Sequence, residues 1–207
     1  MIDYKKTQMD LYQPKTTPSL VDVPEMIFIM VDGQGDPNTS ESYQEAIEIL
    51  YGLSYTIKMS KKGKAVPKGY FEYTVPPLEG LWWLQDGGDV DFSDKEKYCW
   101  TAMIRQPEFV TLEVFEAAKT ALAKKKPGLD LTRARLESFA EGLCAQLMHI
   151  GSYDSEPASI ALLYEFIASS GHQTNLSETR RHHEIYLGDP RKTVPEKRKT
   201  VLRYPIR

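Results

Sequence analysis

The sequence has few cysteines, few histidines and no long apolar run. Its 207 residues include only 2 cysteines and 4 histidines. Cys99 and Cys144 belong to no Cys-x-x-Cys motif and give no disulfide framework, which favours a reducing compartment. The longest apolar run, residues 26–31, is far shorter than the roughly 18 residues that cross a bilayer. Residues 1–20 contain no signal-peptide core. We therefore expect a cytoplasmic protein with no membrane partner.

An excess of positive charge is also missing. Lys and Arg number 26 against 29 Asp and Glu, a net charge of −3, so nothing global attracts a phosphate backbone and we expect no nucleic-acid partner. Hydrophobic residues at 41 % and charged residues at 27 % are typical of a folded globular chain. Aromatic residues are plentiful: 12 Tyr, 7 Phe and 3 Trp. They are candidates for the walls of a site for a flat ligand.

Two stretches of the chain have the same order of predicted elements. In the first, about residues 25–105, a buried strand at 26–31 precedes a glycine turn, an amphipathic helix over 39–58, and β segments at 69–75, 81–84 and 98–104. In the second, about residues 142–205, a strand at 143–150 precedes a helix from Ser155 and strands at 183–187 and 200–204. A helix over about 111–126 links them. The pattern predicts an α+β fold with two strand–helix–strand–strand modules related by a pseudo-two-fold axis and a ligand groove at their seam.

The first 20 residues are polar and contain two prolines. We interpret residues 1–20 as an extended leader that docks late or stays loose. Residues 21–207 then form the single folded domain, with an antiparallel sheet and helices on one face.

Three stretches of the sequence resemble the GyrI-like small-molecule-binding family. They are residues 181–192 with their continuation to 203, residues 79–83, and residues 148–156. The resemblance implies two modules with ligands held in the groove between them. Members of the family include effector-binding domains of transcription regulators and stand-alone proteins. One stand-alone group is similar to enzymes that hydrolyse the cyclopropane of DNA-alkylating natural products within an aromatic cage. Because this chain leaves no room for a helix-turn-helix domain, we expect a stand-alone member.

Glu184 and Tyr186 are the candidate catalytic residues. Strand alternation places them on one face, opposite His183, Ile185 and Leu187. The resemblance implies that the matching acidic and tyrosine positions line the ligand groove. A carboxylate beside aromatic walls is partly desolvated, so we expect a raised pKa and basicity near neutral pH. The alternative interpretation is an ordinary exposed glutamate on an edge strand.

The candidate ligand-binding aromatics are Trp82, Trp83, Trp100 and Tyr70, which lie on or near adjacent predicted strands. Consecutive tryptophans on a strand point to opposite faces, so at most one of Trp82 and Trp83 faces the groove, and the other is expected to pack under a helix. The alternative is that any one of them belongs to the core.

His149 and Tyr153 are further candidates at the turn into the second module's helix, where backbone N–H groups can hold an anionic oxygen. The alternative is a capped helix with a hydrogen-bonded histidine. The pair His182 and His183 lacks metal-ligand spacing, and the glycines at 33 and 35 lack the lysine of a phosphate loop. We expect no metal and no cofactor.

Two functions follow from these residues and the resemblance. In the first, the protein is a detoxifying hydrolase in which Glu184 positions or deprotonates water and Tyr186 donates a hydrogen bond to the ligand carbonyl. In the second, it is a non-catalytic binder, sensor or sequestering protein for planar hydrophobic or cationic compounds. Inhibition of a topoisomerase is suggested only by the family name, and the sequence identifies no protein partner. In both main functions the partner is a planar hydrophobic small molecule.

Overall fold

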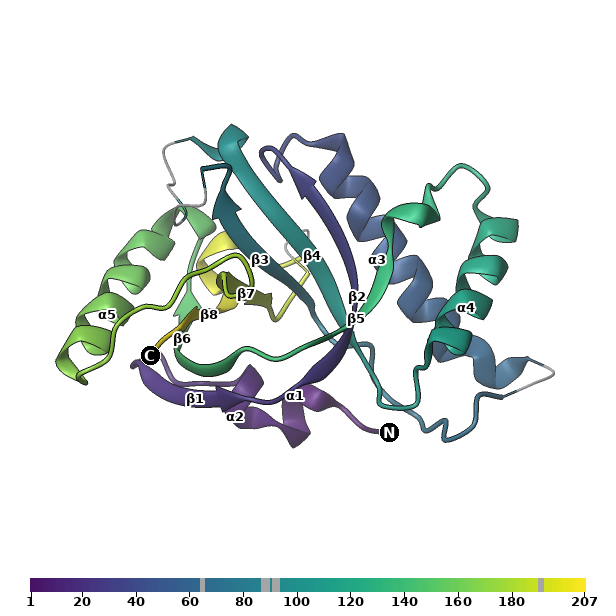
Figure 1. Cartoon of the computed structure of the whole chain (residues 1–207), viewed down its shortest axis with the longest axis horizontal. Helices are drawn as coiled ribbons and strands as arrows, with labels where there is room; N and C mark the ends of the chain where they lie inside the picture. The colour runs from purple at the N-terminus through teal and green to yellow at the C-terminus, as the bar shows by residue number, and fades with distance from the viewer. Residues whose placement is uncertain (64–65, 87–89, 91–93, 190–191) are drawn as a thin grey trace.

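Eight strands form one curled sheet in the computed structural model, which describes residues 1–63, 66–86, 90, 94–189 and 192–207 (Figure 1). Their order across the sheet is β1-β6-β8-β7-β3-β4-β2-β5, and all seven pairings are antiparallel. The strands are β1 (Ser19–Val23), β2 (Met26–Gln34), β3 (Leu78–Leu84), β4 (Tyr98–Gln106), β5 (Arg135–Phe139), β6 (Gly142–Ile150), β7 (His182–Tyr186) and β8 (Lys199–Pro205). The helices are α1 (Tyr4–Thr7), α2 (Met9–Tyr12), α3 (Glu41–Met59), α4 (Leu112–Lys125) and α5 (Glu156–Ser169).

The two predicted modules are present. The first runs β2–α3–β3–β4 and the second β6–α5–β7–β8, and the strands of each lie in equivalent order, β3-β4-β2 and β7-β8-β6. The modules join where β3 pairs with β7, with Gly80 opposite Glu184 at the centre of the pairing. The α+β prediction is therefore confirmed. The edge strands β1 and β5, which the sequence analysis missed, extend the second and first modules.

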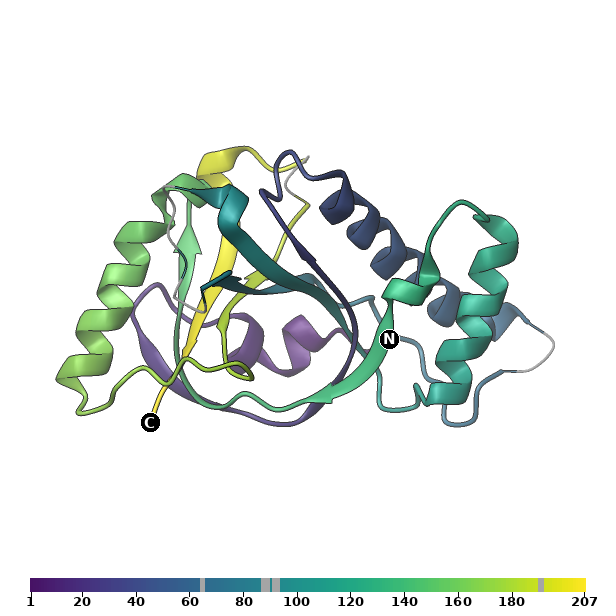
Figure 2. The same cartoon turned by 45° about the horizontal axis from the view of Figure 1, so that its top comes forward.

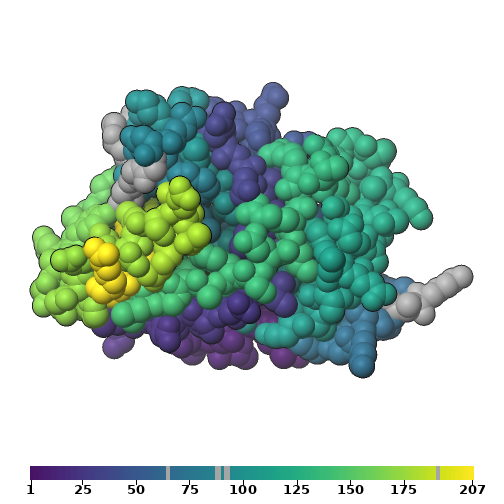
Figure 3. All heavy atoms as spheres, in the orientation of Figure 1, coloured from purple at the N-terminus to yellow at the C-terminus, as the bar shows by residue number. Residues whose placement is uncertain are grey.

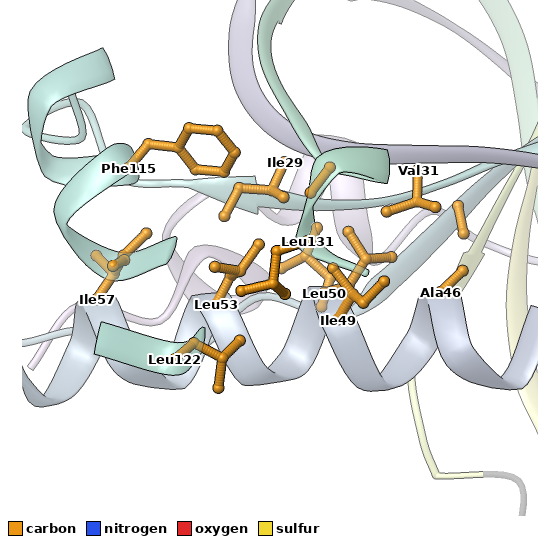
Figure 4. Close-up of a cluster of buried hydrophobic side chains, with 14 of the residues drawn as sticks. Ile29, Val31, Ala46, Ile49, Leu50, Leu53, Ile57, Phe115, Leu122 and Leu131 are labelled. Carbon is orange, nitrogen blue, oxygen red and sulfur yellow. The ribbon is translucent and has the colours of Figure 1, made fainter. Parts of the chain in front are cut away.

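Helix α3 forms the main core of the first module. Ser40 caps it by accepting a hydrogen bond from the backbone of Tyr43. Its apolar residues recur every three or four positions and pack on β2, with α4 covering the far side (Figure 4). Each fully buried aliphatic side chain stabilises the fold by about 1.5–3 kcal/mol. The buried residues of α3 are Tyr43, Ala46, Ile49, Leu50, Leu53, Ser54 and Ile57.

Helix α5 covers the equivalent part of the second module. Ile160, Leu163 and Ile167 pack against β6 and β8, so α3 and α5 lie on the same face of the sheet. In the space-filling view, α5 and α4 occupy opposite ends of the molecule (Figure 3). The seam between β3 and β7 lies between the two helical layers.

The first 20 residues differ from the expected extended leader. They contain the short helices α1 and α2 and the start of β1, and the helices lie inside the curl of the sheet, on the face opposite α3 and α5 (Figure 2). Tyr4, Leu11 and Tyr12 are buried there with Met103 and Ile185. Apolar residues interspersed among polar ones therefore give this segment a packed position.

Residues 69–75 do not form the predicted β segment. Tyr73 makes one isolated bridge to Ile2, with backbone hydrogen bonds of 2.7 Å from Ile2 to Glu72 and from Thr74 to Ile2. Ile2 is the only residue that pairs with this segment in an isolated bridge among the described residues. Pro76 and Pro77 follow and have no N–H donors, so the bridge does not extend into a β ladder. Among the described residues, no helix is long and apolar enough to cross a membrane.

Candidate functional site

The candidate site lies on β7 at the seam of the two modules. His182, Glu184 and Tyr186 point to the face that carries α3 and α5, because they alternate with His183 and Ile185 along the strand. Glu184 is 8 % exposed, so the interpretation as an exposed edge glutamate is wrong. β7 pairs with β8 on one side and with β3 on the other, so it is an interior strand of the sheet.

Two side chains hold the Glu184 carboxylate. Tyr186 donates a hydrogen bond from its hydroxyl to Oε2 at 2.7 Å, and Nε2 of His182 lies 3.0 Å from Oε1. Trp82 on β3 donates from Nε1 to the Tyr186 hydroxyl at 3.0 Å. Trp82, Tyr186 and Glu184 thus form a chain in which each group orients the next. Burial and the neighbouring carboxylate raise the pKa of Tyr186, so its hydroxyl keeps its proton.

Aromatic rings surround this chain. Tyr43 of α3 has its ring centre 5.8 Å from that of Trp82. Tyr153, in the turn η4 (Tyr153–Ser155), meets Tyr186 edge to face with ring centres 5.8 Å apart. The guanidinium of Arg198 lies 5.1 Å from the centre of the Tyr153 ring. Tyr43 was not among the predicted site residues, because its helical spacing in α3 indicates only a core position.

A pocket of about 160 Å³ opens beside Tyr186. Its lining includes Tyr153, Tyr186, Leu187, Thr193, Arg198 and Lys199. The lining of the pocket therefore combines aromatic side chains with cationic ones. Among the sequence-predicted residues, Glu184, Trp82 and Tyr153 all contact Tyr186, and Tyr153 and Tyr186 also line the pocket.

Other predicted residues lie elsewhere. Trp83 faces the opposite side of the sheet, where it packs against the core cluster that includes residues of α1 and α2. The Arg181 guanidinium lies 4.8 Å from its ring, and Trp83 lines a second pocket of about 390 Å³. Tyr70 donates a hydrogen bond to the backbone of Lys58 and packs on Phe109. These contacts are separate from the Glu184 group.

His149 has the hydrogen-bonded arrangement given above as the alternative. Its ring nitrogens lie 2.9 Å from the Ser159 hydroxyl and 3.0 Å from the backbone oxygen of Ser152, and the residue is buried. It fixes the turn that carries Tyr153 relative to β6 and α5. No set of three or more His, Cys, Asp or Glu side chains suited to a metal ion occurs in the described part of the chain.

Trp100 is fully buried beneath Tyr43, with ring centres 4.9 Å apart. A Cβ atom on Gly33 would lie 2.2 Å from this indole, so only glycine fits beside it. Gly33→Ala should lower the free energy of unfolding by about 1–3 kcal/mol, since the ring must shift within a packed core. Chemical denaturation measures the change. Gly128→Ala, where nothing lies within 4 Å, is the control, and equal stability of both variants would contradict the prediction.

Sequence reasoning also missed Glu156, the first residue of α5. It is 1 % exposed. Burial, followed by the charge of Glu184, raises the pKa of its carboxyl well above the ordinary value. Its position in residues 148–156, one of the stretches that resemble the GyrI-like family, was the available signal. A glutamate at the start of a helix usually faces solvent, however, where it interacts favourably with the helix dipole.

A second buried polar cluster lies on the opposite face, beneath α1 and α2. His183 Nδ1 is 2.8 Å from Oε2 of Glu141, and Nη1 of Arg203 is 2.7 Å from the same oxygen. His183 Nε2 is 3.0 Å from Oε2 of Glu79. Arg203 also donates to the backbone oxygen of Leu11 at 2.7 Å. This cluster, formed by Glu79, Glu141, His183 and Arg203, fastens the N-terminal segment to the sheet behind the site.

Comparison with known proteins gives consistent results. Two solved structures from Listeria innocua, one described as a hydrolase and one as an uncharacterized conserved protein, are 46 % and 47 % identical to this chain, with full coverage of both chains and TM-scores of 0.91 and 0.95. The EcmrR C-terminal domain, 13 % identical over 92 % of this chain and 97 % of its own with a TM-score of 0.55, shares the fold. No curated protein matches. The model of the GyrI-like small molecule binding domain matches residues 16–207, and the chain therefore belongs to the GyrI-like family.

Proposed function

We propose that this protein hydrolyses the cyclopropane of DNA-alkylating cyclopropanoid compounds and so detoxifies them. One observation carries the proposal: a nearly buried carboxylate, Glu184, is held by two polar neighbours within an aromatic surround. The small-molecule-binding family and the description of a 46 % identical relative as a hydrolase support it. A base held in one orientation at low exposure is the group that a water-addition reaction needs.

In this reaction Glu184 accepts a proton from water as the water oxygen attacks a strained ring carbon. Tyr186 and His182 fix the carboxylate, so its free lone pairs point in a constant direction. Aromatic rings hold the flat ligand and exclude other nucleophiles. The pocket beside Tyr186 gives the ligand's reactive end a place near the carboxylate.

We assign Tyr186 a different role from the one suggested by the sequence, which was donation of a hydrogen bond to the ligand carbonyl. Its hydroxyl proton is directed to Glu184, and its oxygen accepts from Trp82. In this arrangement Tyr186 orients the base, and its proton is not directed at a ligand carbonyl. Tyr186 is thus a positioning residue in the proposed mechanism.

Turnover stoichiometry tests the proposal. A trace of protein is mixed with excess spirocyclopropyl cyclohexadienone, the reactive unit of such compounds, and the products are followed by mass spectrometry. We expect a ring-opened, water-added product at many equivalents per protein. If the product forms no faster with protein than without it, the hydrolase proposal is overturned.

The same geometry favours one other function. A buried carboxylate among aromatic rings is a counter-charge for a planar cation, with the rings as stacking and cation-π partners. A non-catalytic binder or sequestering protein then binds at most one equivalent without releasing product. Isothermal titration alongside the turnover assay distinguishes this function from hydrolysis.

A further inference from the structure

Glu156 is placed beside the site by the turn that carries Tyr153. Tyr153 lines the pocket and contacts Tyr186, and Glu156 follows it by three residues at the start of α5. On the other side, Thr200 of β8 pairs directly with Tyr186 of β7. Glu156 and Thr200 are each 1 % exposed. Both are therefore buried, next to residues that line the pocket: Glu156 follows Tyr153 in the chain, and Thr200 follows Lys199.

Each of these two residues has a buried polar atom that makes no well-aligned hydrogen bond to another described residue, although the Thr200 hydroxyl lies close enough to the Glu156 carboxyl to lower its pKa. The atoms are Oε1 of Glu156 and Oγ1 of Thr200. A buried polar atom left unpaired costs about 1–3 kcal/mol, so native proteins rarely keep one without a reason. The Glu156 carboxyl, near Thr200 and Glu184, therefore retains hydrogen-bonding capacity that the described side chains do not fully use.

The charges that face Glu156 come from three elements. Glu184 on β7 and Asp154 in η4 are acidic, and Lys95 in η2 (Lys95–Lys97) is the cation. Lys95 is already paired with Asp154 at 3.1 Å. The hydroxyls of Tyr153 and Tyr186 and the hydroxyl of Thr200 are the other polar neighbours. Burial and then Glu184 raise the pKa of Glu156, which favours its neutral form.

The proposed hydrolysis still needs a proton donor for the ligand. Ring opening places negative charge on the ligand carbonyl oxygen, which needs a proton donor. Tyr186 is committed to Glu184. We propose that Glu156 carries a proton and donates it to the carbonyl oxygen of the bound ligand, acting as the general acid opposite the base Glu184. This inference rests on the proposed hydrolysis and assigns its second carboxyl group.

The step balances as the addition of one water molecule. The water oxygen forms a bond to a cyclopropane carbon as an O–H bond breaks, and Glu184 takes that proton. The ring C–C bond breaks, and its electron pair converts the dienone to a phenolate. The oxygen of this phenolate takes the proton of Glu156 and becomes a phenol. Return of one proton from Glu184 to Glu156 restores the enzyme. Two carboxyl groups with separated protonation states are typical of such acid–base pairs.

Infrared difference spectroscopy tests the donor independently of turnover. Wild-type protein should show the C=O stretch of a neutral carboxyl that Glu156→Gln removes. This band should move to lower frequency when an unreactive spirocyclopentyl cyclohexadienone binds, because the carboxyl then donates a hydrogen bond to the ligand. Absence of the band, or a band that the ligand leaves unchanged, would overturn the proposal even if the wild type hydrolyses the strained compound.

Turnover supplies the second test. Glu156→Gln should reduce it by about 10²–10⁴-fold, since the amide donates a hydrogen bond but no proton. Wild-type turnover should also fall on the alkaline side as Glu156 ionises, and the residual activity of the variant should lack this decline. Glu165→Gln, an exposed change on the same helix, is the control. Wild-type-like turnover of Glu156→Gln would overturn the acid role. If the wild type is inactive, the hydrolase proposal fails, and the infrared result alone still decides whether a neutral Glu156 donates a hydrogen bond to the bound ligand.

Discussion

Glu184→Gln should reduce cyclopropane hydrolysis by about 10²–10⁴-fold while leaving ligand binding in place. The amide keeps the size of the carboxyl and can still accept from Tyr186, but it cannot take a proton from water. The carboxylate is held at 2.7 Å by Tyr186 and at 3.0 Å by His182. The loss should therefore appear in kcat and not in KM. Mass-spectrometric rates over a range of ligand concentrations separate the two constants.

Tyr186→Phe is the companion variant. It removes the hydroxyl that links Trp82 to Glu184 but leaves the ring that lines the pocket. We expect a smaller loss than for Glu184→Gln, because the base remains and only its orientation is weakened. Glu165→Gln controls for the change of charge. Full turnover in the Glu184→Gln variant would contradict the prediction, because it would show that Glu184 takes no part in the reaction and serves only in binding.

Glu141→Gln should destabilise the fold by about 3–5 kcal/mol, the usual cost of leaving a buried charge without its partner. Glu141 is 5 % exposed and accepts from both His183 and Arg203. Replacing it by an amide leaves the two buried cations, His183 and Arg203, with Glu79 as their remaining acidic neighbour. Thermal unfolding should show a fall of about 2–4 °C for each kcal/mol lost, given the length of this chain. Glu137→Gln, whose partner Arg135 is at the surface, should change stability by less than about 1 kcal/mol.

The same cluster gives the stability a defined pH dependence. Burial alone lowers the pKa of His183, but Glu141 and Glu79 outweigh it and raise the pKa to about 9. The stabilisation from His183 is therefore complete below its ordinary pKa of 6.5 and is lost as the pH rises through 9. For Glu141, burial raises the pKa, but His183 and Arg203 outweigh it and lower the pKa to about 2. That stabilisation is complete above 4.5 and is lost as the pH falls through 2.

The two pKa shifts describe one ion pair, worth on the order of 3 kcal/mol when counted once. Its contribution is full between pH 4.5 and 6.5. Denaturant unfolding at several pH values should show the wild type losing stability between pH 6.5 and 9. Glu141→Gln should flatten this slope, because His183 loses its main partner. An unchanged slope in the variant would contradict the assignment.

The sequence by itself determined the modular fold, since hydrophobic periodicity and glycine turns are local signals. The runs 26–31 and 143–150 and the helices after them appear where the pattern places them. It also determined that Glu184 and Tyr186 share a face, because alternation along a strand is fixed by the backbone. The resemblance to the GyrI-like family, carried by three local stretches, is confirmed over residues 16–207.

Only the tertiary structure decided which groups meet. The choice between Trp82 and Trp83 depended on the register of β3 against β7, which a sequence pattern does not fix to one residue. The short helices α1 and α2 form because the curled sheet offers them a buried face. Glu156 comes near Glu184 because α5 packs against β6 and β8, which a sequence pattern does not show. Local patterns set strands and helices, whereas desolvation and neighbouring charge depend on the packed fold.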